Sequence, residues 1–186
     1  YEVCYRIQHR AGHWIWVEDS GRVVAWDEKN RPLRLIGTRR DITPEREIEE
    51  KLRLSASVFE HAAEGIYILD SQFRYLSVNP RMTQITGFGD QELHGKSIFD
   101  ESVDKLDQKQ LSYHSIFERI KLEDEWQGEL TEYRKNGQSF PQWLHITAIR
   151  NDENDISHYV GIMSDLTQRK EAEKKLKYLA NFDRLT

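Results

Sequence analysis

The stretch GIMSDLT at residues 161–167 ends an apolar segment and precedes a strongly charged one. A related stretch, GTRRDIT, occupies residues 37–43 in the same setting. The glycine, the aspartate and the threonine of the first stretch each lie 124 positions from their counterparts in the second (161 − 37 = 124). A repeat of this length corresponds to a whole small domain rather than to a solenoid unit. The sequence therefore predicts the end of one domain and all of a second, each followed by a helix.

The composition of the 186 residues limits the class of protein. With 38% hydrophobic and 11% aromatic residues, the chain can form packed cores. The net charge of −5, without a basic face, argues against nucleic acid as the main partner. Cys4 is the single cysteine, which excludes an internal disulfide and fits a reducing compartment. No run approaches the roughly 18 apolar residues of a membrane span, so we expect no membrane contact within this segment. The missing initiator methionine suggests a fragment of a longer protein.

The first 43 residues predict three antiparallel strands, from the alternation of side chains and from turns at residues 11–12 and 27–30. Thr43 and Pro44 then have the order of an N-cap and a first helical residue. Ile48 and Leu52 begin an apolar seam at coiled-coil spacing on this helix, and Leu176 and Leu179 lie on the corresponding seam after residue 167. These seams predict a parallel homodimer.

Residues 66–78 predict a strand pair, and Asn79-Pro80 predicts the start of a short helix. Asn79 could instead contact a ligand, although N-capping explains it without one. A longer helix over 107–121 and strands over 126–134, 139–150 and 156–166 follow. This order predicts an α+β domain, with a five-stranded antiparallel sheet and helices on one face. The predicted boundaries are a strand half at 1–43, a linker helix at 44–58, a complete domain at 59–167 and an exit helix at 168–186.

Several motifs of the complete domain, taken in order, resemble the PAS family of sensory domains. They are Asn79-Pro80, Gly87-Phe88, the segment LHGK at 93–96, WQGEL at 126–130, RKNG at 134–137 and DLT at 165–167. Residues 5–43 resemble the C-terminal strand half of another PAS domain. The resemblance implies a PAS fold and a sensory role in a bacterial, cytoplasmic signalling protein, without catalysis by this chain.

The last eight residues, LANFDRLT at 179–186, resemble the start of a diguanylate cyclase (GGDEF) domain. That resemblance implies that the parent protein makes cyclic di-GMP, or carries a degenerate cyclase linked to a phosphodiesterase. The alternative for these residues is an ordinary helix end. No histidine follows His158, so a phospho-acceptor helix is not predicted.

PAS domains commonly sense a small molecule or redox state in a pocket between the sheet and the short helices. The resemblance implies a lining drawn from Tyr67, Met82, Phe99, Tyr113, His114, Phe117, Trp143 and His145. The alternative for each residue is a role in the core, because aromatic residues at strand or helix spacing are usually core residues.

The cofactor is left open by the sequence. His114 is the candidate axial ligand of a haem, with His94 as a weaker second, and non-covalent flavin is the other chromophore considered. A flavin-reactive cysteine is not present in the segment GKSI at 95–98, and Cys4 lies outside the complete domain. No metal site is predicted, since the acidic loop at 152–155 fits a solvated turn.

The repeated junction is the candidate for signal transmission. We expect Asp41 and Asp165 to tie the last strand to the following helix, through nearby backbone N–H groups or a basic neighbour. Thr43 and Thr167 complete the two junctions. The main functional alternative is a PAS domain that binds protein rather than ligand and only sets the geometry of a dimer.

Overall fold

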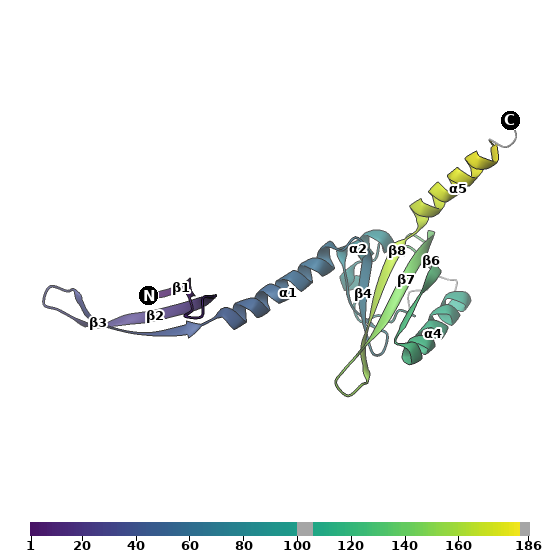
Figure 1. Cartoon of the computed structure of the whole chain (residues 1–186). Coiled ribbons are helices and arrows are strands. Elements are labelled where there is room, and N and C mark those ends of the chain that lie inside the picture. Colours follow the sequence, from purple (N-terminus) through teal and green to yellow (C-terminus); the bar gives the residue numbers. More distant parts are fainter. Residues whose placement is uncertain (100–105, 183–186) are drawn as a thin grey trace. The chain divides into compact units, whose positions relative to one another are not determined.

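The computed structural model describes residues 1–99 and 106–182, with side chains described outside 106–112 and 180–182. The chain divides into two compact units, residues 1–57 and 58–186 (Figure 1). Residues 183–186, which hold half of the cyclase-like ending, lie outside the described part. In that part, no helix is both long and apolar enough to cross a membrane.

The first unit is a three-stranded antiparallel sheet followed by a helix. Its strands are β1 (Glu2–Gln8), β2 (Trp14–Trp26) and β3 (Pro32–Asp41), in the order β1-β2-β3. Pro32 opens β3, where its missing N–H costs no ladder bond. Helix α1 (Thr43–His61) begins two residues after β3 ends. The three predicted strands, and a helix that follows them directly, are confirmed.

The second unit contains the five-stranded antiparallel sheet expected from the sequence. The strands are β4 (Gly65–Asp70), β5 (Tyr75–Val78), β6 (Glu125–Tyr133), β7 (Ser139–Arg150) and β8 (Ile156–Asp165). Their order is β5-β4-β8-β7-β6. The helices are α2 (Pro80–Thr86), α3 (Asp90–Leu93), α4 (Leu106–Glu123) and the exit helix α5 (Thr167–Phe182). The α+β fold class is therefore confirmed.

Alternation along the strands decides which face of this sheet is the core. In β7, the alternate side chains of Phe140, Gln142, Leu144 and Ile146 are buried, whereas those of Pro141, Trp143 and His145 are more exposed. Ile116, Phe117 and Ile120 of α4 belong to the same buried cluster. The core thus lies between one face of the sheet and the helices, and the opposite face is its outer face.

Asn79 holds the start of α2 and is fully buried. Its side-chain oxygen accepts hydrogen bonds from the N–H groups of Met82 and Ile66, both at 2.9 Å. Its amide nitrogen donates to the carbonyls of Phe59 and Glu64. The predicted N-cap is confirmed, and these bonds also tie α2 to β4.

Candidate functional site

Four of the predicted pocket residues come together inside the second unit. Tyr67, Met82, Tyr113 and Phe117 are all buried members of the core cluster. Phe99 packs against this cluster and meets the Phe117 ring edge-on, with 5.8 Å between ring centroids. They therefore occupy the interior position that the sequence suggested, packed against one another.

Tyr67 fills the space over the central strand β8. A Cβ atom added at Gly161 would lie 2.0 Å from the Tyr67 ring, so the ring rests directly on the glycine backbone. The Tyr67 ring also meets Tyr75 edge-on, with 5.7 Å between centroids. Glycine is needed at this position because any side chain would displace the ring.

Trp143 and His145 are not part of this interior, which corrects the sequence-based expectation. Both occupy odd positions of β7, and successive strand residues point to opposite faces of a sheet. Trp143 is 41% exposed on the outer face. The Nε2 atom of His145 lies 3.3 Å from the Glu125 carboxylate, on the neighbouring strand.

The structure also corrects the expectation that His114 lines the interior. It is exposed on α4, while its neighbour Tyr113 and the following Ile116 and Phe117 face the core. Adjacent helical residues are about 100° apart around the axis, which carries His114 away from the interior. Its ring lies near that of the partly buried Phe99, with 6.3 Å between the ring centroids. Its position does not fit an axial ligand directed into the core.

A buried polar cluster lies among the apolar interior residues and was not expected from the sequence. The Tyr113 hydroxyl donates to Glu132 Oε2 at 3.0 Å, and Gln142 Nε2 donates to the Tyr113 oxygen at 3.4 Å. Burial and the neighbouring Glu132 carboxylate raise the pKa of Tyr113 well above its usual value. The signal in the sequence was that Glu132 and Gln142 occupy core-facing positions of β6 and β7.

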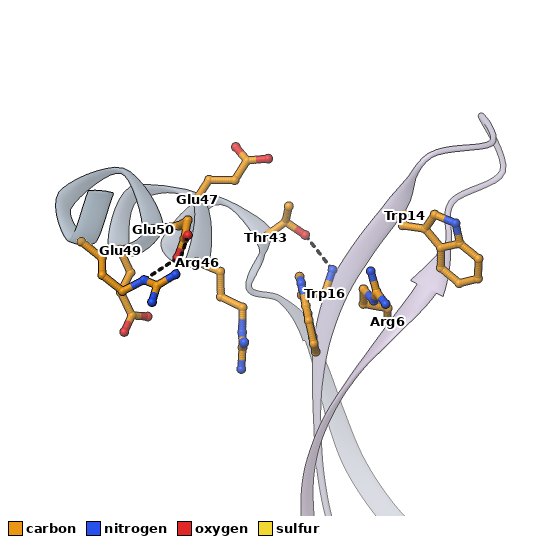
Figure 2. Close-up of a pocket in the computed structure, with 9 residues that line it drawn as sticks. Arg6, Trp14, Trp16, Thr43, Arg46, Glu47, Glu49 and Glu50 are labelled. Atoms are coloured by element: carbon orange, nitrogen blue, oxygen red, sulfur yellow. Dashed lines mark hydrogen bonds and ion pairs between the residues drawn. The ribbon is translucent and has the colours of Figure 1, made fainter. Parts of the chain in front are cut away.

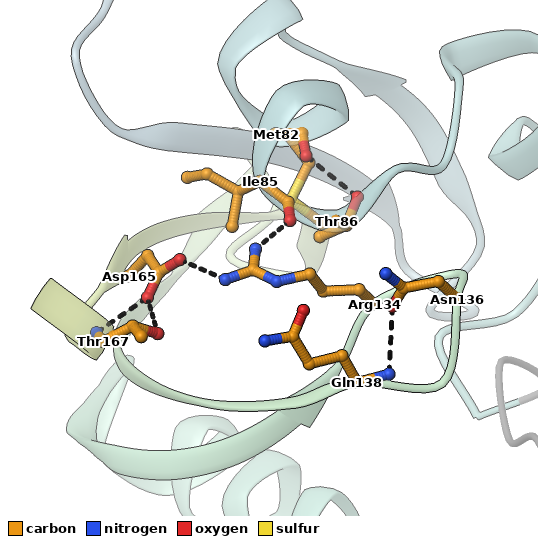
Figure 3. A network of polar contacts seen from close by, with 8 residues as sticks. All are labelled: Met82, Ile85, Thr86, Arg134, Asn136, Gln138, Asp165 and Thr167. Atoms are coloured by element: carbon orange, nitrogen blue, oxygen red, sulfur yellow. Dashed lines mark hydrogen bonds and ion pairs between the residues drawn. The ribbon is translucent and has the colours of Figure 1, made fainter.

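The β8–α5 junction is held by Asp165 (Figure 3). Its Oδ1 atom accepts from the N–H of Thr167 at 2.8 Å and from the Thr167 hydroxyl at 2.5 Å. Its Oδ2 atom forms an ion pair with Arg134 Nη2 at 2.6 Å. Burial acts to raise the pKa of Asp165, but the bonds from Thr167 and Arg134 outweigh it and leave that pKa lowered. Asp165, the last residue of β8, therefore holds Thr167, the first residue of α5, through its carboxylate.

Arg134 extends this junction to the helical side of the domain. Its Nη1 atom donates to the carbonyl of Ile85 near the end of α2. The guanidinium also stacks on Phe140, 4.2 Å from the ring centroid. The N–H of the next residue, Lys135, donates to the Thr86 carbonyl at 2.8 Å. One side chain thus connects the end of α2, Phe140 of β7 and Asp165 at the end of β8, next to the start of α5 (Figure 3).

The sequence predicted that a basic neighbour could pair with Asp165 but did not identify Arg134. The two residues are 31 positions apart, and only the pairing of β6, β7 and β8 brings them together. The RKNG turn indicated a hairpin, without showing where its first side chain points.

The first junction repeats the threonine contact but not the ion pair. The Asp41 carboxylate accepts the N–H of Thr43 at 2.9 Å. The hydroxyl and N–H of Thr43 hold the pKa of Asp41 below its usual value. Asp41 forms no ion pair within the described residues. The seam residues Ile48, Leu52, Leu176 and Leu179 are all exposed on their helices.

Comparison with known proteins identifies the fold. A PAS domain family model matches residues 63–168, more than half of the chain, and a PAS fold model matches residues 1–39. A Halobacterium salinarum protein, the bacterioopsin transcriptional activator, is 25% identical over 132 residues. That match covers 69% of this chain and 19% of the relative, so the chain spans about a fifth of the length of this relative.

Two solved PAS domains show the same architecture. One, of a protein from Colwellia psychrerythraea, gives a TM-score of 0.58 at 17% identity and covers 63% of this chain and 98% of that one. The other, of an HTR-like protein from Haloarcula marismortui, gives 0.53 at 20% identity and covers 66% and 97%. At these identities the likeness shows the fold.

The fold and the matches define a sensory module of signalling proteins, a class that is not itself catalytic. The chain belongs to the PAS domain family.

Proposed function

We propose that this chain is the sensory segment of a signal-transduction protein and passes the packing state of its interior to α5. The observation that carries the proposal is the double attachment of Asp165. This carboxylate binds the first residue of α5 and, through Arg134, the end of α2. A shift of α2 caused by ligand or redox change would alter the Arg134 contact and so bias the start of the exit helix.

If the domain senses a ligand, we expect it to bind in the interior, around Tyr67, Met82, Phe99, Tyr113 and Phe117. A ligand there would have to displace or repack some of these side chains, since they belong to the core cluster or pack against it. The absorption spectrum of the purified chain is the first measurement. A Soret band would support haem, a band near about 450 nm would support flavin, and a featureless spectrum would exclude both chromophores from the purified protein.

The described interior residues form one packed cluster, and this favours a second function, a ligand-free PAS domain that organises a dimer. In that case the exposed seams at Ile48/Leu52 and Leu176/Leu179 form the contact between two parallel copies. Light scattering at high concentration tests the dimer. A chain that stays monomeric over the whole range would contradict both this function and a helix-mediated relay.

For the output, we propose a diguanylate cyclase that follows α5 in a cytoplasmic protein, on the resemblance of residues 179–186. The transcriptional relative suggests a different output, a regulator of transcription. Cyclic di-GMP formation from GTP by the parent protein decides between them. We expect Asp165→Asn to leave basal synthesis intact and to abolish its regulation; normal regulation in this variant would refute the proposed transmission role.

A further inference from the structure

The first junction lies beside a groove of about 520 Å³ between the sheet and α1 (Figure 2). Arg6 of β1 and Trp14 and Trp16 of β2 line the sheet side. The α1 side is lined by Thr43, Arg46, Glu47, Glu49, Glu50 and Arg53. Because all of these residues belong to the first unit, the groove is a feature of that unit alone.

Trp16 makes three contacts with the segment that starts α1. Its backbone N–H donates to the Thr43 hydroxyl oxygen at 2.8 Å, and its carbonyl accepts the N–H of Ile42 at 2.9 Å. The Arg46 guanidinium stacks on its ring, 4.2 Å from the centroid. Arg6 lies 5.5 Å from the same centroid, and Figure 2 shows the Trp16 ring between the two arginines. Thr43 was predicted to cap α1, but its hydroxyl oxygen is bonded to the strand.

The second junction lacks this arrangement at the corresponding place. There the N–H of Leu166 donates to the carbonyl of Pro141 at 2.9 Å, as Ile42 donates to Trp16. Proline has neither an N–H to donate nor an indole ring on which an arginine could stack. The second junction uses the Arg134–Asp165 ion pair instead, whereas Asp41 at the first junction has no ion pair among the residues that the structure describes. The two junctions therefore fix their helices by different physical means.

The face of α1 that meets the sheet is opposite to its apolar seam. At about 100° per residue, Arg46, Glu49, Glu50 and Arg53 fall within one arc of about 100°, and all four line the groove. Ile48 and Leu52 lie about 200° and 240° from Arg46 around the helix. Holding Arg46 against Trp16 therefore turns the exposed seam away from the sheet.

We infer that Trp16 is a positioning residue that fixes the rotation of α1 on the first sheet and so sets the direction in which the Ile48/Leu52 seam points. The seam's role in a dimer rests on the proposed function, whereas the attachment of α1 by Trp16 does not.

Trp14 supplies a matched control. It lies two residues before Trp16, lines the same groove and is 61% exposed. It has no hydrogen bond or cation–π contact with α1 within the described residues. Replacing either tryptophan by alanine keeps the backbone bonds of β2, and within the described residues only Trp16→Ala removes a cation–π contact with the helix.

Hydrogen exchange of the 186-residue chain tests the inference. Trp16→Ala should speed exchange of the first-turn amides of α1, including the Arg46 N–H that donates to the Ile42 carbonyl, by about two- to fivefold. Trp14→Ala should leave these amides unchanged. Arg46→Gln should reproduce the Trp16→Ala effect, and the double variant should add nothing to it. Equal effects of the two tryptophan variants, additive effects of Trp16→Ala and Arg46→Gln, or equal acceleration throughout β1–β3 would overturn the inference.

A cross-linking measurement separates this result from the dimer. In a Cys4→Ser background, Leu52→Cys should form a disulfide between two copies if the seam is an interface. Failure to cross-link would count against the dimer alone, because the exchange result reports on α1 within one copy.

Discussion

Replacing Arg134 by alanine should destabilise the second unit more than is usual for a residue next to a hairpin turn. The change removes the ion pair with Asp165, the hydrogen bond to the Ile85 carbonyl and the stacking on Phe140. The side chains of Arg134 and Asp165 are each 20% exposed. Their pair therefore falls between an exposed pair, worth about 0–1 kcal/mol, and a broken buried pair, which costs about 3–5 kcal/mol.

The other two contacts add to this loss. A hydrogen bond to a carbonyl contributes about 1 kcal/mol, and an exposed cation–π contact contributes about 0.5–1 kcal/mol. We expect a total loss of about 2–4 kcal/mol for Arg134→Ala. Lys135→Ala is the control on the same hairpin. Its ion pair with Glu92 has side chains that are 53% and 36% exposed, so its loss should stay below about 1 kcal/mol.

Denaturant-dependent hydrogen exchange of peptides from β7 and β8 is the suitable assay, because it reports on the second unit separately from the first. Equal free energies of unfolding for Arg134→Ala and Lys135→Ala would refute the reasoning that one guanidinium ties α2, β7 and α5 together. A larger loss for Arg134→Ala that is unchanged in an Asp165→Asn background would show that the ion pair is not its source.

Three further predictions address the junction, the central strand and the two sheet faces. Because the pKa of Asp165 is lowered in the folded state, this carboxylate stabilises the fold fully above the ordinary pKa of aspartate. That stabilisation is lost as the pH falls through the folded-state pKa. Between about pH 2 and 6, the free energy of unfolding of Asp165→Asn should therefore fall less with acid than that of the unchanged protein. Gly161→Ala should cost about 1–3 kcal/mol through the clash with Tyr67, and urea unfolding should show a smaller cost in a Tyr67→Leu background. Phe117→Ala should cost about 3–5 kcal/mol, whereas Trp143→Ala should cost far less by the same measurement, and similar costs would contradict the assignment of the sheet faces.

The fold could be predicted because its signals are local. The strand at 32–41 begins at a proline, the helix at 80–86 begins after Asn79 and ends at Gly87, and both junctions recur 124 residues apart (161 − 37). Gly87 adopts a φ of 82°, a conformation that glycine accepts without strain. Each of these features depends on a few neighbouring residues, which a single sequence displays.

The candidate site was predictable only in part, because a family resemblance gives residue types but not their face. Trp143 and His145 are aromatic and lie in the correct strand, yet they have the wrong parity for the core. The apolar residues Phe140, Leu144 and Ile146 alternate along β7 and mark its buried face, so they could have placed Trp143 and His145 on the other face. His114 differs from Tyr113 by one helical step, and no local signal separates the two orientations.

Long-range polar contacts were the least predictable feature. The bond of Arg134 to Ile85 and its pair with Asp165 join positions 49 and 31 residues apart. The Tyr113–Glu132–Gln142 cluster likewise joins one helix to two strands. Such contacts follow from the register of the whole sheet, which no short stretch of sequence specifies.

The two glycines of the repeated stretch are required for different reasons. A Cβ atom at Gly161 would meet the side chain of Tyr67, whereas one at Gly37 would lie 2.5 Å from the backbone carbonyl oxygen of Ser20. A second substitution could relieve the first clash, because Tyr67 can become smaller. No change of side chain removes a carbonyl oxygen. Over evolutionary time, position 161 is therefore free to vary together with position 67, while position 37 should keep its glycine in every descendant that keeps the sheet.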